Sequence, residues 1–163
     1  MSTAGRKYIR LPLIAGLIVL ADQLTKAWVL RVISPYEVIP VIPGFFNLIH
    51  VQNPGGAFGF FASAGSQWRA LFFIIFSIAA VLMILYLYKS TPASYKWLLS
   101  AFSLVAGGAA GNLVDRLRFG QVVDFIDIYV GGWHWPAFNI ADSAITVGML
   151  VFAYYLITRK YPD

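Results

Sequence analysis

The chain of 163 residues contains no cysteine. Disulfide bonds, thiol catalysis, thiolate metal sites and lipid attachment to a cysteine of its own are therefore excluded. Charge is also scarce, since Asp, Glu, Lys and Arg make up only 12% of the residues while apolar residues make up 60%. A soluble domain carries roughly 25% charged residues. The chain has too little polar surface to cover itself in water, and a lipid bilayer is its expected solvent.

Basic residues outnumber acidic ones and give a net charge of +5. They form no patch or stripe of the kind that binds nucleic acid, because most stand singly or in pairs at the ends of apolar runs. This placement is typical of residues that anchor a membrane protein to anionic head groups. The expected partners therefore include membrane lipids and exclude nucleic acid.

Four apolar segments predict four transmembrane helices, at about residues 11–32, 68–88, 96–114 and 141–158. The first follows a basic N-terminus, as a secretory signal peptide would. It lacks a small-residue cleavage site and is expected to remain as an uncleaved span. Residues 1–163 then form a single integral membrane domain with two long outer loops, 33–67 and 115–140. Seven basic residues lie on the side of the termini and four on the side of the loops, so both termini are expected in the cytoplasm.

Each long loop contains one strand pattern. FNLIHVQN (46–53) and VVDFIDIYV (122–130) are rich in β-branched and aromatic residues. The prolines before the first of them exclude a helix there. Within the third span, AGGAAG (106–111) supplies small residues that allow other helices to approach closely.

Four of the seven acidic residues lie in the stretch Gly111–Asp142. Asp124 stands in an apolar strand, where a lone carboxylate is costly unless it has a function. Asp142 stands in the first turn of the fourth helix, where it either completes a cap with Asn139 or acts chemically. Asp127 lies three residues after Asp124, on the opposite face of a strand, and is expected to be structural or solvated.

Two carboxylates held close together share one proton. One can then take a proton from water while the other protonates the substrate, which is the chemistry of aspartic peptide hydrolysis. No metal or cofactor is needed, and His50 and His134 lack metal-ligand spacing. Ser143 has no nucleophile-elbow context. A Ser–Lys dyad that uses Lys26 remains an alternative.

Other polar residues are expected beside the same surface. Asp22 and Lys26 lie at i,i+4 within the first span. They either neutralise each other near the interface or point into the bundle and support a site. Arg116 is expected to pair with Asp115 or with Asp22. The remaining expected members are Asn53, Asn112 and Asn139.

Five motifs occur in a fixed order along the chain: DQLTK (22–26), NPGGAFG (53–59), GNLVDR (111–116), VVDFID (122–127) and FNIADS (138–143). In these motifs the chain resembles the bacterial lipoprotein signal peptidase family, also called signal peptidase II. The resemblance implies an all-α membrane protein with four transmembrane helices, a small extracytoplasmic β-cradle and a short surface helix, which we assign to residues 56–65. It also implies an aspartic endopeptidase of the inner membrane, which removes the signal peptide of diacylglyceryl-modified prolipoproteins by cutting before the lipidated cysteine.

Carried over to this sequence, the catalytic pair falls on Asp124 and Asp142. The supporting or substrate-binding residues fall on Asp22, Lys26, Asn53, Asn112, Asp115, Arg116 and Asn139. Pro54-Gly55-Gly56 departs from the pattern of many relatives and leaves the turn geometry of that loop open. The resemblance implies lipidated prolipoprotein substrates, an active site at the outer face, and no cofactor or metal, and we expect a monomer. The alternative is a small proton-coupled transporter, which would carry its ionisable residues near the membrane midplane.

Overall fold

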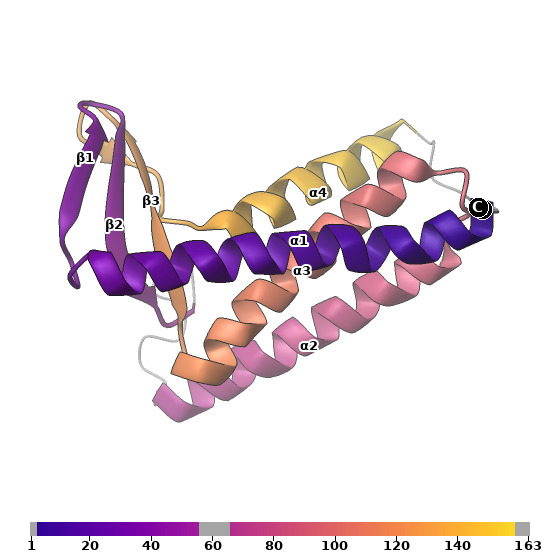
Figure 1. The fold of residues 1–163 in the computed structure, drawn as a ribbon, viewed down its shortest axis with the longest axis horizontal. Helices are drawn as coiled ribbons and strands as arrows, with labels where there is room; N and C mark the ends of the chain where they lie inside the picture. Colours follow the sequence, from indigo (N-terminus) through magenta and orange to yellow (C-terminus); the bar gives the residue numbers. More distant parts are fainter. Residues whose placement is uncertain (1–2, 56–65, 159–163) are drawn as a thin grey trace.

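The computed structural model describes residues 3–55 and 66–158. Its helices are α1 (Thr3–Val32), α2 (Ser66–Ser90), α3 (Lys96–Phe119) and α4 (Ile140–Ile157). All four are long and apolar enough to cross a membrane, as the four apolar segments predicted. The start of α1 and the end of α4 lie at one end of the bundle, and a small sheet lies at the other end (Figure 1).

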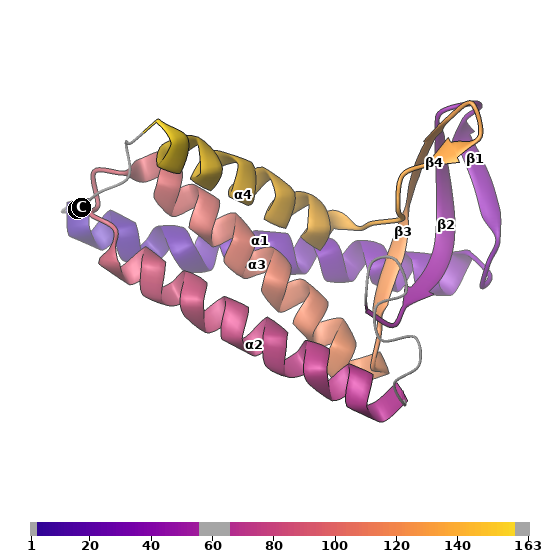
Figure 2. The ribbon, with the colours of Figure 1, turned by 180° about the vertical axis from the view of Figure 1, so that it is seen from behind.

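Helix α3 is the centre of the bundle and packs against α1, α2 and α4 (Figure 2). Its small residues make this possible. A Cβ atom on Gly107 would lie 2.9 Å from the backbone of Ala15 on α1, and one on Gly108 would lie 2.4 Å from the carbonyl oxygen of Ala141 on α4. The close packing predicted from AGGAAG is therefore confirmed.

The sheet has four antiparallel strands in the order β1 (Val38–Ile42), β2 (Phe46–Asn53), β3 (Val122–Val130) and β4 (Trp133–His134). Both strands predicted from the sequence are confirmed, and they pair with each other although they belong to different loops. Val123 and Phe125 of β3 pack with Val29 and Ile33 near the end of α1 in one apolar cluster. This cluster fixes the sheet against the bundle.

The third helix is longer than predicted. It was expected to end near residue 114, with a loop from 115, but α3 continues to Phe119. Gly120 ends it in the left-handed conformation, with a φ of 71° and an N–H that donates to Arg116 O. Asp115 and Arg116 therefore lie on the helix. The surface helix assigned to 56–65 lies outside the described residues.

Candidate active site

The buried carboxylate of Asp124 lies on β3 and faces the end of the helix bundle. Its Oδ2 accepts a hydrogen bond from Asn53 Nδ2 at 3.0 Å, and its Oδ1 accepts one from Asn139 Nδ2 at 2.7 Å. The residue is only 2% exposed. Burial, together with the charge of Asp142, raises the pKa of Asp124 from 3.8 to about 7, against the lowering effect of the hydrogen bonds from Asn53 and Asn139.

Asp142 occupies the first turn of α4 and has two roles in the structure. With Asn139 it forms the capping box that the sequence predicted: Asp142 N donates to Asn139 Oδ1 at 2.9 Å, and Asn139 N donates to Asp142 Oδ2 at 3.3 Å. Its other oxygen, Oδ1, accepts a hydrogen bond from Asn112 Nδ2 at 2.7 Å. Asn139 thus contacts both Asp124 and Asp142, and the two carboxylates belong to one network.

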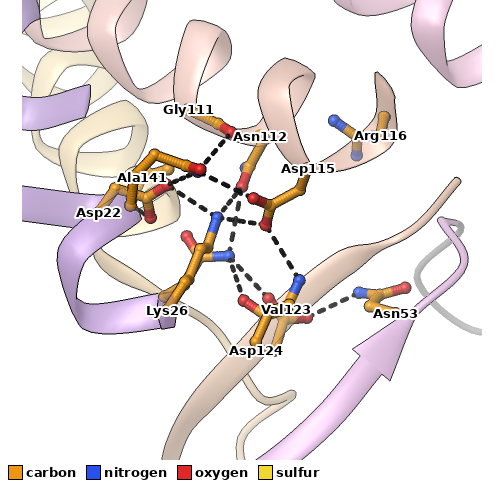
Figure 3. A network of polar contacts seen from close by, with 12 residues as sticks. Asp22, Lys26, Asn53, Gly111, Asn112, Asp115, Arg116, Val123, Asp124 and Ala141 are labelled. Carbon is orange, nitrogen blue, oxygen red and sulfur yellow. Dashed lines mark hydrogen bonds and ion pairs between the residues drawn. The ribbon is translucent and has the colours of Figure 1, made fainter. Parts of the chain in front are cut away.

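A second group of charges, shown in Figure 3, is joined to Asp142 through Asn112. Lys26 Nζ is 2.8 Å from Asp22 Oδ2 and 2.8 Å from Asp115 Oδ2, and it also donates to Asn112 Oδ1 at 3.0 Å. All three charged side chains are at most 2% exposed. Of the two readings of Asp22 and Lys26, the structure supports the one in which they point into the bundle. A Cβ on Gly111 would lie 2.7 Å from Asp22 Oδ2, so only glycine leaves room for this carboxylate.

Gln23 was not predicted as part of this group. Its Nε2 donates to Asp115 Oδ1 at 2.8 Å and to Asp22 Oδ2 at 3.2 Å. Its position in DQLTK, next to Asp22, was the only sequence signal that could have pointed to it. The glutamine amide thus supplies a donor to Asp115 Oδ1, which Lys26 leaves open, and shares Asp22 Oδ2 with Lys26.

The predicted partners of Arg116 were wrong, because Asp22 and Asp115 both face Lys26. Arg116 Nη1 instead donates to Ser77 Oγ on α2 at 3.1 Å, and its guanidinium lies 5.6 Å from the ring centroid of Phe73. Neither α2 residue was singled out from the sequence, since a serine and a phenylalanine in an apolar run carry no local signal of a site.

Asp127 belongs to a separate cluster on the sheet. It is buried, it accepts a hydrogen bond from Asn47 Nδ2 at 2.8 Å, and its other oxygen lies 2.7 Å from His134 Nδ1. The ring of His134 stacks on Tyr129. Asp127 is therefore a structural residue of the sheet, one of the two roles expected for it.

Two cavities meet at Asp142. One, of about 470 Å³, lies between α2, α3 and α4 and is mostly apolar, with Arg116, Asn112 and Asp142 among its lining residues. The other, of about 610 Å³, runs between α4 and residues 135–138, with Asn53 and Asp142 on its wall. Asp142 is thus accessible from two sides. Within the described residues, no group of three or more His, Asp or Glu side chains is arranged to hold a metal ion.

Comparison with known proteins identifies the fold and its family. Residues 14–158 match the family model described as signal peptidase (SPase) II. The chain belongs to the signal peptidase II family. The lipoprotein signal peptidase of Desulforapulum autotrophicum is 51% identical over 97% of this chain and 98% of its own length. That of Syntrophus aciditrophicus is 48% identical over 90% of this chain and 91% of its own length.

Solved structures agree with this assignment to signal peptidase II. A bacterial membrane enzyme determined at 2.3 Å resolution matches with a TM-score of 0.80 and 34% identity, over 91% of this chain and 87% of its own. Another, determined at 1.9 Å, matches with a TM-score of 0.79 and 35% identity, over 88% and 90%. The chain is thus a peptidase of the membrane, and none of these likenesses supports the transporter alternative.

Proposed function

We propose that this chain is an aspartic endopeptidase that removes the signal peptide of diacylglyceryl-modified prolipoproteins, with Asp124 and Asp142 as its catalytic pair. Membership of the signal peptidase II family supports the substrate and the reaction. The observation that carries the catalytic assignment is the position of Asn139, whose side-chain amide donates to Asp124 and whose backbone N–H donates to the carboxylate of Asp142. The other linked pair of carboxylates, Asp22 and Asp115, differs because both of its members are ion-paired with Lys26.

The two carboxylates differ in environment, and this suggests their roles. Asp142 lines both cavities and is the carboxylate that an attacking water would meet first. Asp124 is buried, and its pKa of about 7 lets it carry the shared proton near neutral pH. Asp142 would take a proton from water as the oxygen attacks the scissile carbonyl carbon, while Asp124 protonates the carbonyl oxygen. In the collapse of the resulting diol the C–N bond breaks as Asp142 gives its proton to the nitrogen of the lipidated cysteine and Asp124 takes a proton back from a diol hydroxyl.

The other proposed residues would support this pair. Lys26 reaches Asp142 through Asn112, since it donates to Asn112 Oδ1 while Asn112 Nδ2 donates to Asp142. Asn53 and Asn139 orient Asp124 through their amides. Each of these contacts favours one rotamer of a carboxylate, which is the preorganisation that hydrolysis requires.

The count along the sequence, seven basic residues on the side of the termini against four on the side of the long loops, supports an orientation with both termini in the cytoplasm. The catalytic pair would then lie at the outer face of the bacterial inner membrane, where a membrane-anchored prolipoprotein presents its cleavage site. We further propose that the chain acts as a monomer among lipids, without a cofactor.

Mass spectrometry of a purified lipidated prolipoprotein incubated with the protein tests the proposal. The wild-type chain should release the signal peptide with or without a chelator, and Asp124→Asn and Asp142→Asn should release none while remaining folded. Asp127→Asn is the matched control and should still cleave, because Asp127 contacts neither member of the pair in the described structure. Cleavage by either dyad variant would overturn the assignment, and chelator sensitivity would overturn the metal-free mechanism.

A further inference from the structure

Helix α2 contributes the residues that hold Arg116 in place. Arg116 Nη1 donates to Ser77 Oγ at 3.1 Å. The hydroxyl proton of Ser77 is already used, because Ser77 Oγ donates to Phe73 O at 2.7 Å. The hydroxyl oxygen therefore presents its lone pairs to the guanidinium. Because the bond to Phe73 O fixes the hydroxyl group, Ser77 can only accept from Arg116.

The ring of Phe73 lies between this guanidinium and the turn that follows β2. Its centroid is 5.6 Å from Arg116 Cζ, within the range of a cation–π contact. On the β2 side, a Cβ atom on Gly55 would lie 2.4 Å from a carbon of the ring, so the ring fills the space that a side chain there would need. Gly55 N donates to Asn53 Oδ1 at 3.0 Å, and Asn53 in turn donates to Asp124.

All of these α2 and α3 groups face one cavity. Phe73, Ser77, Arg116 and Asp142 line the apolar space of about 470 Å³ between α2, α3 and α4. Arg116 is a permanent cation on the wall of the same space as Asp142. A substrate whose apolar part enters this cavity would bring its carbonyl or ester oxygens within reach of the guanidinium.

We propose that Ser77 and Phe73 are positioning residues, which hold Arg116 so that its guanidinium binds oxygen atoms of the substrate beside Asp142. This inference rests on the proposed peptidase function. Ser77 fixes the position of one guanidinium nitrogen, and Phe73 fixes the plane against which the guanidinium lies. Their effect is on substrate binding rather than on the chemical step, since neither side chain contacts the catalytic pair in the described structure.

Cleavage kinetics of Ser77→Ala with a lipidated prolipoprotein test the proposal. Loss of one hydrogen bond to a charged group predicts a KM raised about tenfold with kcat changed by less than about twofold. Ser77→Thr keeps the acceptor and should restore the KM. Ser103→Ala is the matched control, because buried Ser103 also donates to the carbonyl four residues back, Leu99 O at 2.8 Å, but lies more than three turns before Arg116 on α3.

A binding measurement separates positioning from a general effect on folding. In the inactive Asp124→Asn background, Ser77→Ala should weaken binding of a fluorescent lipidated prolipoprotein about tenfold. With Arg116→Gln also present, Ser77→Ala should add less than about twofold, because its effect passes through Arg116. Phe73→Leu should behave in the same way.

Two results would overturn the inference. One is a KM of Ser77→Ala equal to that of Ser103→Ala. The other is an equal loss of binding from Ser77→Ala with and without Arg116. Absence of cleavage by the wild-type chain would instead refute the proposed function, and so the two failures are distinguishable.

Discussion

Asp115 Oδ2 accepts the backbone N–H of Val123 at 3.1 Å, and Val123 is the residue immediately before Asp124. Asp22 has the same relationship to the other candidate catalytic residue. Its Oδ1 accepts the backbone N–H of Ala141, immediately before Asp142, at 3.0 Å. Lys26 forms ion pairs with both accepting carboxylates. The buried Lys26 ammonium therefore positions, through Asp115 and Asp22, the backbone next to both Asp124 and Asp142.

Removal of that cation should be strongly destabilising. Lys26→Met would leave Asp22 and Asp115 buried without a counter-ion, and loss of one partner from a buried ion pair costs about 3–5 kcal/mol. We expect a clear decrease in the free energy of unfolding in detergent, measured by denaturant titration. Lys89→Met removes an exposed lysine side chain and is the control. An unchanged stability of Lys26→Met would show that the cluster is not ionised as described.

Two substitutions of Asn139 separate its effect on stability, as the cap of α4, from its effect on catalysis. Asn139→Ala removes the cap and should cost about 0.5–2 kcal/mol of stability, whereas Asn139→Ser keeps a capping oxygen and should cost little. Both changes remove the amide that donates to Asp124, and both should lower kcat/KM by roughly 10- to 100-fold. Thermal unfolding and cleavage assays on the two variants check this. Full activity in Asn139→Ser would mean that the amide is not needed.

Stability should depend on pH through Asp124. The pKa of Asp124 is about 7 in the folded protein, against an ordinary value of 3.8 that applies to the unfolded chain. The folded state therefore binds the proton more tightly than the unfolded state. The stabilising effect is complete below pH 3.8 and is lost as the pH rises through about 7. The Asp124→Asn variant has no carboxyl group to titrate, so it does not lose this contribution as the pH rises. Its free energy of unfolding, compared with that of the wild type, should therefore increase between pH 4 and pH 8. Glu37→Gln, at an exposed position, is the control. A difference that is independent of pH would contradict the raised pKa.

The contact between α3 and α4 should not tolerate a side chain at Gly108. A Cβ there would lie 2.4 Å from Ala141 O, and such overpacking costs about 1–3 kcal/mol. Gly16→Ala on α1 is the matched control, because nothing lies within 4 Å of its Cβ position. That change should be neutral or stabilising by up to about 1 kcal/mol. Denaturant titration of both variants tests the difference, and equal stabilities would contradict it.

The sequence by itself determined the membrane class, the four helices and the two main strands. Each of these follows from local patterns: apolar length for the helices, and β-branched and aromatic residues for FNLIHVQN and VVDFIDIYV. It also determined the cap between Asn139 and Asp142, since the two residues are neighbours in the first turn of one helix. Asp124 could be selected because a carboxylate in an apolar strand is costly.

Only the tertiary structure decided the partners of Arg116 and Asp115. The sequence predicted Asp115 or Asp22 as the partner of Arg116, but Asp22 pairs with Lys26 four residues along α1, and the packing of α1 on α3 brings Asp115 to the same lysine. Packing of α2 then gives Arg116 a serine and an aromatic ring, which no local pattern marks as polar partners. Long side chains choose partners by distance in space, and residues 77 and 116 approach only because α2 and α3 cross there. Local periodicity sets where a helix runs, whereas the partners of its side chains depend on which helices become its neighbours.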